Sequence, residues 1–173
     1  IKMTNSIMTE NFAILGGAVL TAGFPGFGSS HVIMTSCTMA SNSARDRGGA
    51  VYAEPNSTFA TTDCAVISNY ASFGGAVFAD NASHVDISTS RFESNRAQVG
   101  AAAVVSASGT IALTNSVFES NFAISNNSDG VGIVNFGGNV ECDPTRCLRV
   151  CTLCAMDKAE FFDGGKLPPP QPA

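Results

Sequence analysis

Charge is what this sequence most clearly lacks. Only 13% of its residues are charged, well below the usual fraction of about 25%. The nine lysines and arginines are spread thinly along a chain of net charge −5. No basic stripe or polybasic cluster is therefore present, and the sequence argues against nucleic acid and anionic lipid as partners.

Long apolar runs are missing as well. The longest nearly apolar stretch, residues 99–105, is too short to cross a bilayer, so no transmembrane segment is predicted. No signal peptide is recognised, the first residue is not methionine, and the chain opens just before a repeat. We expect a processed or partial product of a longer precursor.

The residues typical of helices, Glu, Lys and Leu, are also scarce. Gly, Ala, Ser and Asn take their place. Small and β-branched residues suit tight turns and stacked strands, so the composition predicts an all-β protein.

A short phrase recurs five times along the chain. It consists of an asparagine, an alanine two residues later and, in its complete form, the tetrapeptide Gly-Gly-Ala-Val. The asparagines lie 31, 27, 26 and 26 residues apart and are Asn11, Asn42, Asn69, Asn95 and Asn121. Self-similarity at such a period is typical of a solenoid, in which each repeat forms one coil that stacks on the next.

Each repeat contains three segments with the pattern of short strands. Alternating residues such as Val85-Asp86-Ile87 precede the asparagine and predict a strand with one buried face. A second inward column stands three residues before the asparagine, and Gly-Gly-Ala-Val forms the third segment. Whether its valine or the following residue points inward stays open.

Three short strands in about 26 residues are typical of a parallel β-helix, in which equivalent positions lie about 4.8 Å apart. A left-handed β-helix would show a six-residue period, and the spacing of 26 residues is not a multiple of six. Parallel crossovers are right-handed in nearly all cases. We predict a right-handed parallel β-helix of five to six coils over residues 1–141. The asparagines predict an internal amide ladder at a bend. The pairs of glycines predict a sharp corner.

Two motifs recur in these coils. Phe92-Glu93-Ser94-Asn95 and Phe118-Glu119-Ser120-Asn121 read FxxN, and Gly16–Val19, Gly48–Val51 and Gly74–Val77 read GGA[I/L/V]. Over residues 6–134 the chain thereby resembles the repeats of chlamydial polymorphic outer membrane proteins, and similar repeats occur in large proteins of algae and other protists. The resemblance implies a β-helical, surface-exposed adhesin passenger.

Cys37 and Cys64 occupy the same position in adjacent coils. Stacking would place their Cα atoms about 4.8 Å apart, which is within the range of a disulfide. An inter-coil disulfide and a ladder of two buried free thiols both fit this placement.

Four further cysteines cluster after the last repeat, at Cys142, Cys147, Cys151 and Cys154. Their spacing favours two disulfides over one zinc site, and a redox C-x-x-C pair is a weaker alternative. Because a solenoid needs its open end covered, we interpret residues 142–162 as a cysteine-rich cap with a short helix near residues 155–162. The proline-rich tail at 163–173 should be an extended polyproline segment.

The repeat is interrupted by two insertions, which in solenoids often lie on the binding face. The candidate partner contacts in them are Phe24, Phe27, Asn126 and Asn127. Glycosylation sequons begin at Asn56, Asn81 and Asn126, and they matter if the source is eukaryotic and secretory.

A catalytic constellation is hard to find. Glu93 and Glu119 share an outward position in adjacent coils, about as far apart as the carboxylates of retaining glycosidases, but Arg91 projects from the same strand. His31 and His84 share a column two coils apart, about 9.6 Å, which is too far for one metal ion. We predict no catalytic, cofactor-binding or metal-binding residues.

These features predict a non-enzymatic structural or adhesin-like interaction module. It would be a segment of a larger exported protein or a rigid scaffold subunit of a large assembly, with proteins or a surface glycan as partners. The expected location is extracellular or at the cell surface, with an organelle lumen such as the thylakoid lumen as the alternative. The alternative function is a β-helical carbohydrate-active enzyme, either a polysaccharide lyase or a hydrolase.

Overall fold

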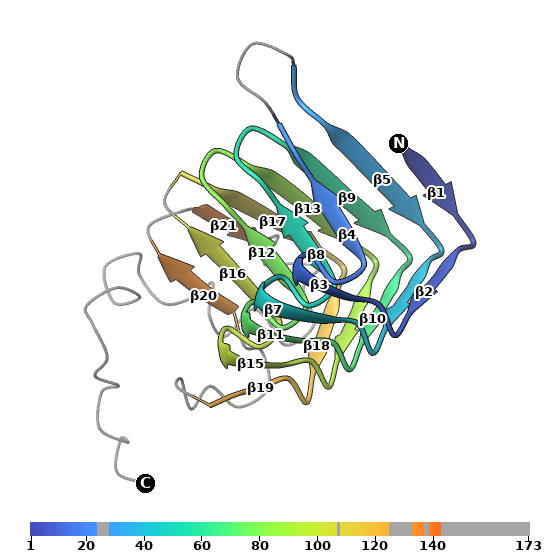
Figure 1. The fold of residues 1–173 in the computed structure, drawn as a ribbon. Coiled ribbons are helices and arrows are strands. Elements are labelled where there is room, and N and C mark those ends of the chain that lie inside the picture. The colour runs from blue at the N-terminus through green and yellow to red at the C-terminus, as the bar shows by residue number, and fades with distance from the viewer. Residues whose placement is uncertain (24–27, 107, 125–132, 137–138, 143–173) are drawn as a thin grey trace, which may run out of the picture.

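The chain winds as an all-β parallel solenoid of about four turns (Figure 1). The computed structural model describes residues 1–23, 28–106, 108–124, 133–136 and 139–142. Within these ranges the regular structure consists of strands alone, and the strands pair in parallel. We number the repeats one to five by their asparagines, from Asn11 to Asn121.

Two of the four sheets lie before the asparagine of each repeat. Sheet A consists of β1 (Lys2–Thr4), β5 (His31–Thr35), β9 (Thr58–Thr62), β13 (His84–Ser88), β17 (Thr110–Thr114) and β21 (Asn139–Cys142). Sheet B consists of β2 (Ile7–Thr9), β6 (Thr38–Ala40), β10 (Ala65–Ile67), β14 (Arg91–Glu93) and β18 (Val117–Glu119).

The other two sheets follow the asparagine. Sheet C consists of β3 (Phe12–Leu15), β7 (Ser43–Arg47), β11 (Tyr70–Phe73), β15 (Arg96–Val99) and β19 (Phe122–Ala123). Sheet D consists of β4 (Val19–Thr21), β8 (Val51–Ala53), β12 (Val77–Ala79), β16 (Ala103–Ser106) and β20 (Ile133–Phe136).

Each complete repeat therefore has four strands, and the prediction of three was wrong. The strand missed from sequence is that of sheet C, which begins directly after the asparagine. Its inward residue is the alanine of the repeated phrase, such as Ala71, which is fully buried. In a strand of four residues between an asparagine and a glycine, the alternation of buried and exposed residues is too short to distinguish the strand from a bend.

A β-bulge in β7 explains an irregularity of the repeat. The pairing of β7 shifts against both β3 and β11, because β7 has one residue more than β11. For this reason Asn42 stands six residues before Gly48, whereas Asn69 stands five before Gly74. An extra residue of this kind bends a strand locally while the pairing on either side continues.

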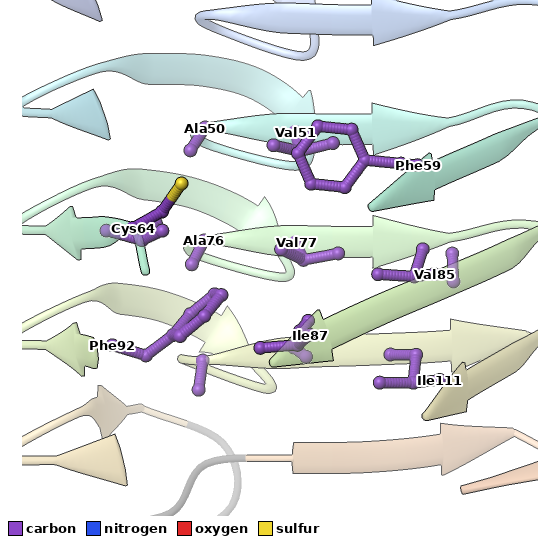
Figure 2. Packing of buried hydrophobic residues seen from close by; sticks show 14 of the residues in the cluster. Ala50, Val51, Phe59, Cys64, Ala76, Val77, Val85, Ile87, Phe92 and Ile111 are labelled. Carbon is purple, nitrogen blue, oxygen red and sulfur yellow. The ribbon is translucent and has the colours of Figure 1, made fainter. Parts of the chain in front are cut away.

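The core is built from columns of like residues. Figure 2 shows Val77 of β12 and Val85 and Ile87 of β13 projecting into the interior, and all three are fully buried. In the next column the rings of Phe92 and Phe118 stack with their centroids 4.9 Å apart. Contacts of this kind are expected where coils stack one strand spacing apart.

The orientation of the Gly-Gly-Ala-Val segment, left open by the sequence, is decided by packing. Its valines, such as Val51 and Val77, point inward and join the main core. The following residues, Tyr52, Phe78 and Val104, point outward but are also buried, because they form a second cluster with Leu15 and Phe73. The solenoid thus has a small apolar cluster outside the coil, between sheets C and D.

Each described corner contains a residue with positive φ. At the corner between sheets C and D this residue is the first glycine of the pair, such as Gly74 with φ +64°, where an added Cβ would collide with the carbonyl oxygen of Val77. The corners between sheets A and B and between B and C use other residues, such as Asp63 at φ 56° and Ser94 at φ 54°. The left-handed region is unfavourable for these residues.

Candidate functional site

The five repeated asparagines form a hydrogen-bonded ladder through the coil corners. The Asn69 side-chain amide donates to Asn95 Oδ1 at 3.0 Å and to the carbonyl oxygen of Met39 at 3.0 Å, while Asn69 Oδ1 accepts from Asn42 Nδ2 at 3.1 Å. The same side-chain bonds join Asn11 to Asn42 at 2.8 Å and Asn95 to Asn121 at 3.0 Å. These amides hold consecutive coils together and are not available for a ligand.

A second ladder runs through the corner between sheets A and B. The Cys37 backbone N–H donates to Cys64 Sγ at 3.3 Å, and the Cys64 N–H donates to Ser90 Oγ at 3.1 Å. The Ser90 N–H donates in turn to Ser116 Oγ at 3.1 Å. Sulfur and hydroxyl oxygen therefore have the same structural role at this position.

Cys37 and Cys64 are both buried free thiols in the structure. Of the two alternatives left by the sequence, the structure has the thiol ladder and not the disulfide. Burial raises the pKa of the Cys64 thiol above its usual value, which favours the unreactive neutral form. The backbone of Cys142 ends β21, while Cys147, Cys151 and Cys154 lie outside the described residues, as do most of the predicted cap and the whole tail.

The paired glutamates of sheet B are bridged by an arginine. Glu93 and Glu119 lie in register on β14 and β18, and Arg91 Nη2 contacts Glu93 Oε2 at 3.0 Å and Glu119 Oε2 at 3.3 Å. Arg91 therefore forms ion pairs with both carboxylates. This arrangement makes the pair a solvated ion-pair network and a poor acid and base couple.

The two histidines remain apart. Thr58 lies between His31 and His84 in the register of sheet A, so two strand spacings, about 9.6 Å, separate them. His31 Nε2 instead contacts Ser29 Oγ at 3.2 Å. Among the described residues, no group of three or more His, Cys, Asp and Glu side chains has the arrangement of a metal site.

The repeat pattern did not reveal a polar cluster on the outside of repeats two to four. Asp80 Oδ2 accepts hydrogen bonds from the Tyr52 hydroxyl at 2.5 Å and from Arg47 Nη1 at 3.2 Å, and Asp80 Oδ1 accepts from Ser106 Oγ at 2.9 Å. The Arg47 guanidinium also lies 5.0 Å from the centroid of the Phe78 ring. We call Arg47, Tyr52, Asp80 and Ser106 the outer brace.

The pKa values of two groups in the outer brace, Tyr52 and Asp80, are shifted. Burial, followed by the contacts with Asp80, raises the pKa of Tyr52 to about 12. Burial alone would raise the pKa of Asp80, but hydrogen bonds from Tyr52, the Asn81 backbone and Ser106, together with the charge of Arg47, lower it below its ordinary value. All of these polar groups already have partners, so the brace connects three repeats and leaves little for a substrate.

Exposed aromatic side chains gather instead on the outer face of sheet C. Phe12 is 73% exposed, Tyr70 43% and Phe122 49%. They stand one residue after their asparagines, in a column with Ser43 and Arg96. Because sheet C was not recognised as a sheet from sequence, this column was not found there either.

Two of the three asparagines predicted as glycosylation sites lie in described turns. Asn56 and Asn81 are exposed in equivalent turns, between β8 and β9 and between β12 and β13. The third site, Asn126, and the proposed partner contacts Phe24, Phe27 and Asn127 lie outside the described residues.

No protein-family model, no curated protein and no solved structure matches this sequence. The described part of the chain contains no helix long and apolar enough to cross a membrane.

Proposed function

We propose that this protein is a non-enzymatic structural and interaction module. It acts as an adhesin-like segment of a larger exported protein or as a rigid scaffold subunit of a large assembly. In this proposal the coil is right-handed with five to six turns, the cysteine-rich segment caps it, and it works outside the cell, at the cell surface or in an organelle lumen such as that of the thylakoid.

One observation carries the proposal: the residues that repeat have partners within the coil, and the exposed aromatic rings of the described residues lie on one outer face. Among the described residues, every buried side-chain nitrogen and oxygen has a hydrogen-bond partner. The exposed rings of Phe12, Tyr70 and Phe122 are concentrated on sheet C. Exposed apolar groups that gather on one surface are typical of an interaction site.

The alternative, a polysaccharide lyase or hydrolase, would need Glu93 and Glu119 as its acid and base. Both carboxylates are already engaged in ion pairs with Arg91, whereas the acid and the base of such a pair must be free to act on the sugar. Activity screening on acidic polysaccharides with Glu93→Gln and Glu119→Gln separates the two functions. Cleavage that disappears in both variants would establish the enzyme and contradict the proposal.

The proposal itself is tested on the native material. Cross-linking with mass spectrometry should yield links between this protein and a macromolecular partner, with the linked positions clustered on one outer face. A strictly solitary monomer without any bound macromolecule would contradict it.

A further inference from the structure

The aromatic column of sheet C has a regular spacing. Its residues, one from each repeat, stand in strand register as Phe12, Ser43, Tyr70, Arg96 and Phe122. Rings therefore occupy every second strand, and neighbouring rings are about 9.6 Å apart, two strand spacings. The core does not require such an alternation, because these side chains point away from it.

The same face carries positive charge without counter-charge. Arg45 and Arg96 are exposed, and among the described residues neither forms an ion pair; the Arg96 guanidinium lies 5.8 Å from the centroid of the Phe122 ring. The one acidic residue in the described strands of sheet C is Asp46, which contacts Arg47 Nε at 3.6 Å. On a chain of net charge −5, this face is locally basic.

We propose that the outer face of sheet C binds an extended acidic polysaccharide of β-1,4-linked uronic acids. Sugar rings stack on Phe12, Tyr70 and Phe122, and sugar carboxylates bind Arg45 and Arg96. This inference rests on the proposed interaction function and specifies its partner.

Three features of such a polymer fit the face. A sugar unit in an extended chain is about as long as one strand spacing, and β-1,4 linkage returns the same ring face to the same side at every second sugar. The apolar face of a sugar packs on exposed aromatic rings. A guanidinium group binds a carboxylate through two parallel hydrogen bonds, so the rings and the arginines recognise different parts of one polymer.

The first experiment is titration calorimetry of the full chain with mannuronate oligosaccharides as the acidic β-1,4 probe. Cello-oligosaccharides of equal length are the neutral β-1,4 probe. We expect the mannuronate oligomers to bind, the affinity to fall with added salt, and the neutral oligomers to bind at least about tenfold more weakly. Equal affinity for both probes would overturn the assignment of an acidic ligand.

The second experiment locates the site with matched variants. Tyr70→Ala and Arg96→Gln should each weaken mannuronate binding by about tenfold, whereas Tyr70→Phe, which keeps the ring, should bind like the wild type. The controls are Ile7→Ala, which truncates a side chain that is 75% exposed on sheet B, and Arg91→Gln on the same sheet. Both controls should leave binding unchanged.

The outcomes distinguish this inference from the function on which it rests. Unchanged affinity in Tyr70→Ala and Arg96→Gln would overturn the site. If neither probe binds but cross-linking finds a protein partner, the polysaccharide inference fails and the interaction module stands. If neither probe binds and the native protein is solitary, both fail.

Discussion

The inside of the coil corners and the outer face of sheet C differ in how their residues repeat along the solenoid. Inside, the same residue type returns in every repeat, as in the asparagine ladder from Asn11 to Asn121. Outside, the column through Phe12, Tyr70 and Phe122 alternates rings with a serine and an arginine. Repetition therefore identifies residues that hold coils together, and variation identifies residues that are available to a partner.

The physical reason is the stacking distance. Equivalent side chains on adjacent coils are about 4.8 Å apart, so an inward side chain must fit its own copy in the next coil. An outward side chain has solvent on one side and is free of that requirement. The outer brace is an exception, because its side chains point outward and yet bind one another.

The largest expected effect tests the inner ladder. Asn69→Ala removes the side-chain donor to Asn95 and Met39 and the acceptor for Asn42. We expect it to lower the free energy of unfolding by about 3–5 kcal/mol, because several buried groups lose their partners. Urea unfolding measured by circular dichroism checks the value.

Asn11→Ala is the matched control for the ladder. Asn11 stands at the exposed end and donates its side-chain amide to Asn42 alone. We expect a loss of about 1 kcal/mol. Equal effects of the two variants would mean that the ladder stabilises the interior no more than its end.

The next effect tests the glycine corner. In Gly74→Ala the new Cβ would collide with the Val77 carbonyl oxygen, and alanine would have to adopt the φ of +64° at this position. We expect the free energy of unfolding to fall by about 2–4 kcal/mol. Ser94→Gly is the opposite change, because it places a glycine at a φ of 54° that a serine now adopts. Its free energy of unfolding should stay within about 1 kcal/mol of the wild-type value. Thermal melts of both variants check this, and a harmless Gly74→Ala would show that the corner can rearrange.

The outer brace tests whether an outward position alone makes a side chain dispensable. The lowered pKa of Asp80 means that its ionised form stabilises the fold. This contribution is complete above the unfolded pKa of about 3.9 and is lost as the pH falls through the folded pKa. Asp80→Asn should therefore lower stability at pH 7 by about 1–2 kcal/mol and flatten the acid limb of a plot of melting temperature against pH.

The pKa of Tyr52 is shifted in the opposite direction to that of Asp80, and Tyr52 provides a second test of the outer brace. Its pKa is raised from 10.0 to about 12, so its contribution is complete below pH 10 and is lost as the pH rises toward 12. In Tyr52→Phe the alkaline loss of stability should be smaller than in the wild type. An unchanged alkaline limb would show that the tyrosine hydroxyl does not stabilise the brace.

The smallest effect concerns the cysteine and serine ladder. Cys64→Ser places in repeat three the residue that repeats four and five already have, Ser90 and Ser116. We expect a change within about 1 kcal/mol. A loss of about 2–4 kcal/mol, the range of a removed disulfide, would instead indicate a Cys37–Cys64 bond, and mass spectrometry of the alkylated protein would distinguish the two states.

Sequence reasoning could predict the features that depend on equivalence between repeats. The period predicts stacked parallel strands, and the recurrence of asparagine predicts an amide ladder. It did not predict the bulge at β7, although the spacing from Asn42 to Gly48 is one residue longer than that from Asn69 to Gly74, because the strand that carries the bulge was not recognised. It could not predict the outer brace either, because Arg47 and Tyr52 of repeat two and Asp80 of repeat three stand at different positions of their repeats.

For this protein the order of residues alone establishes a stacked β-solenoid, since one coil must match the next at every strand spacing. The tertiary structure decided which residues turn outward and which of these find a partner. Val77 and Phe78 are neighbours in sequence, yet one enters the core and the other joins an outer cluster. That choice depends on the packing of sheet C against sheet D, and no pattern within a single repeat contains it.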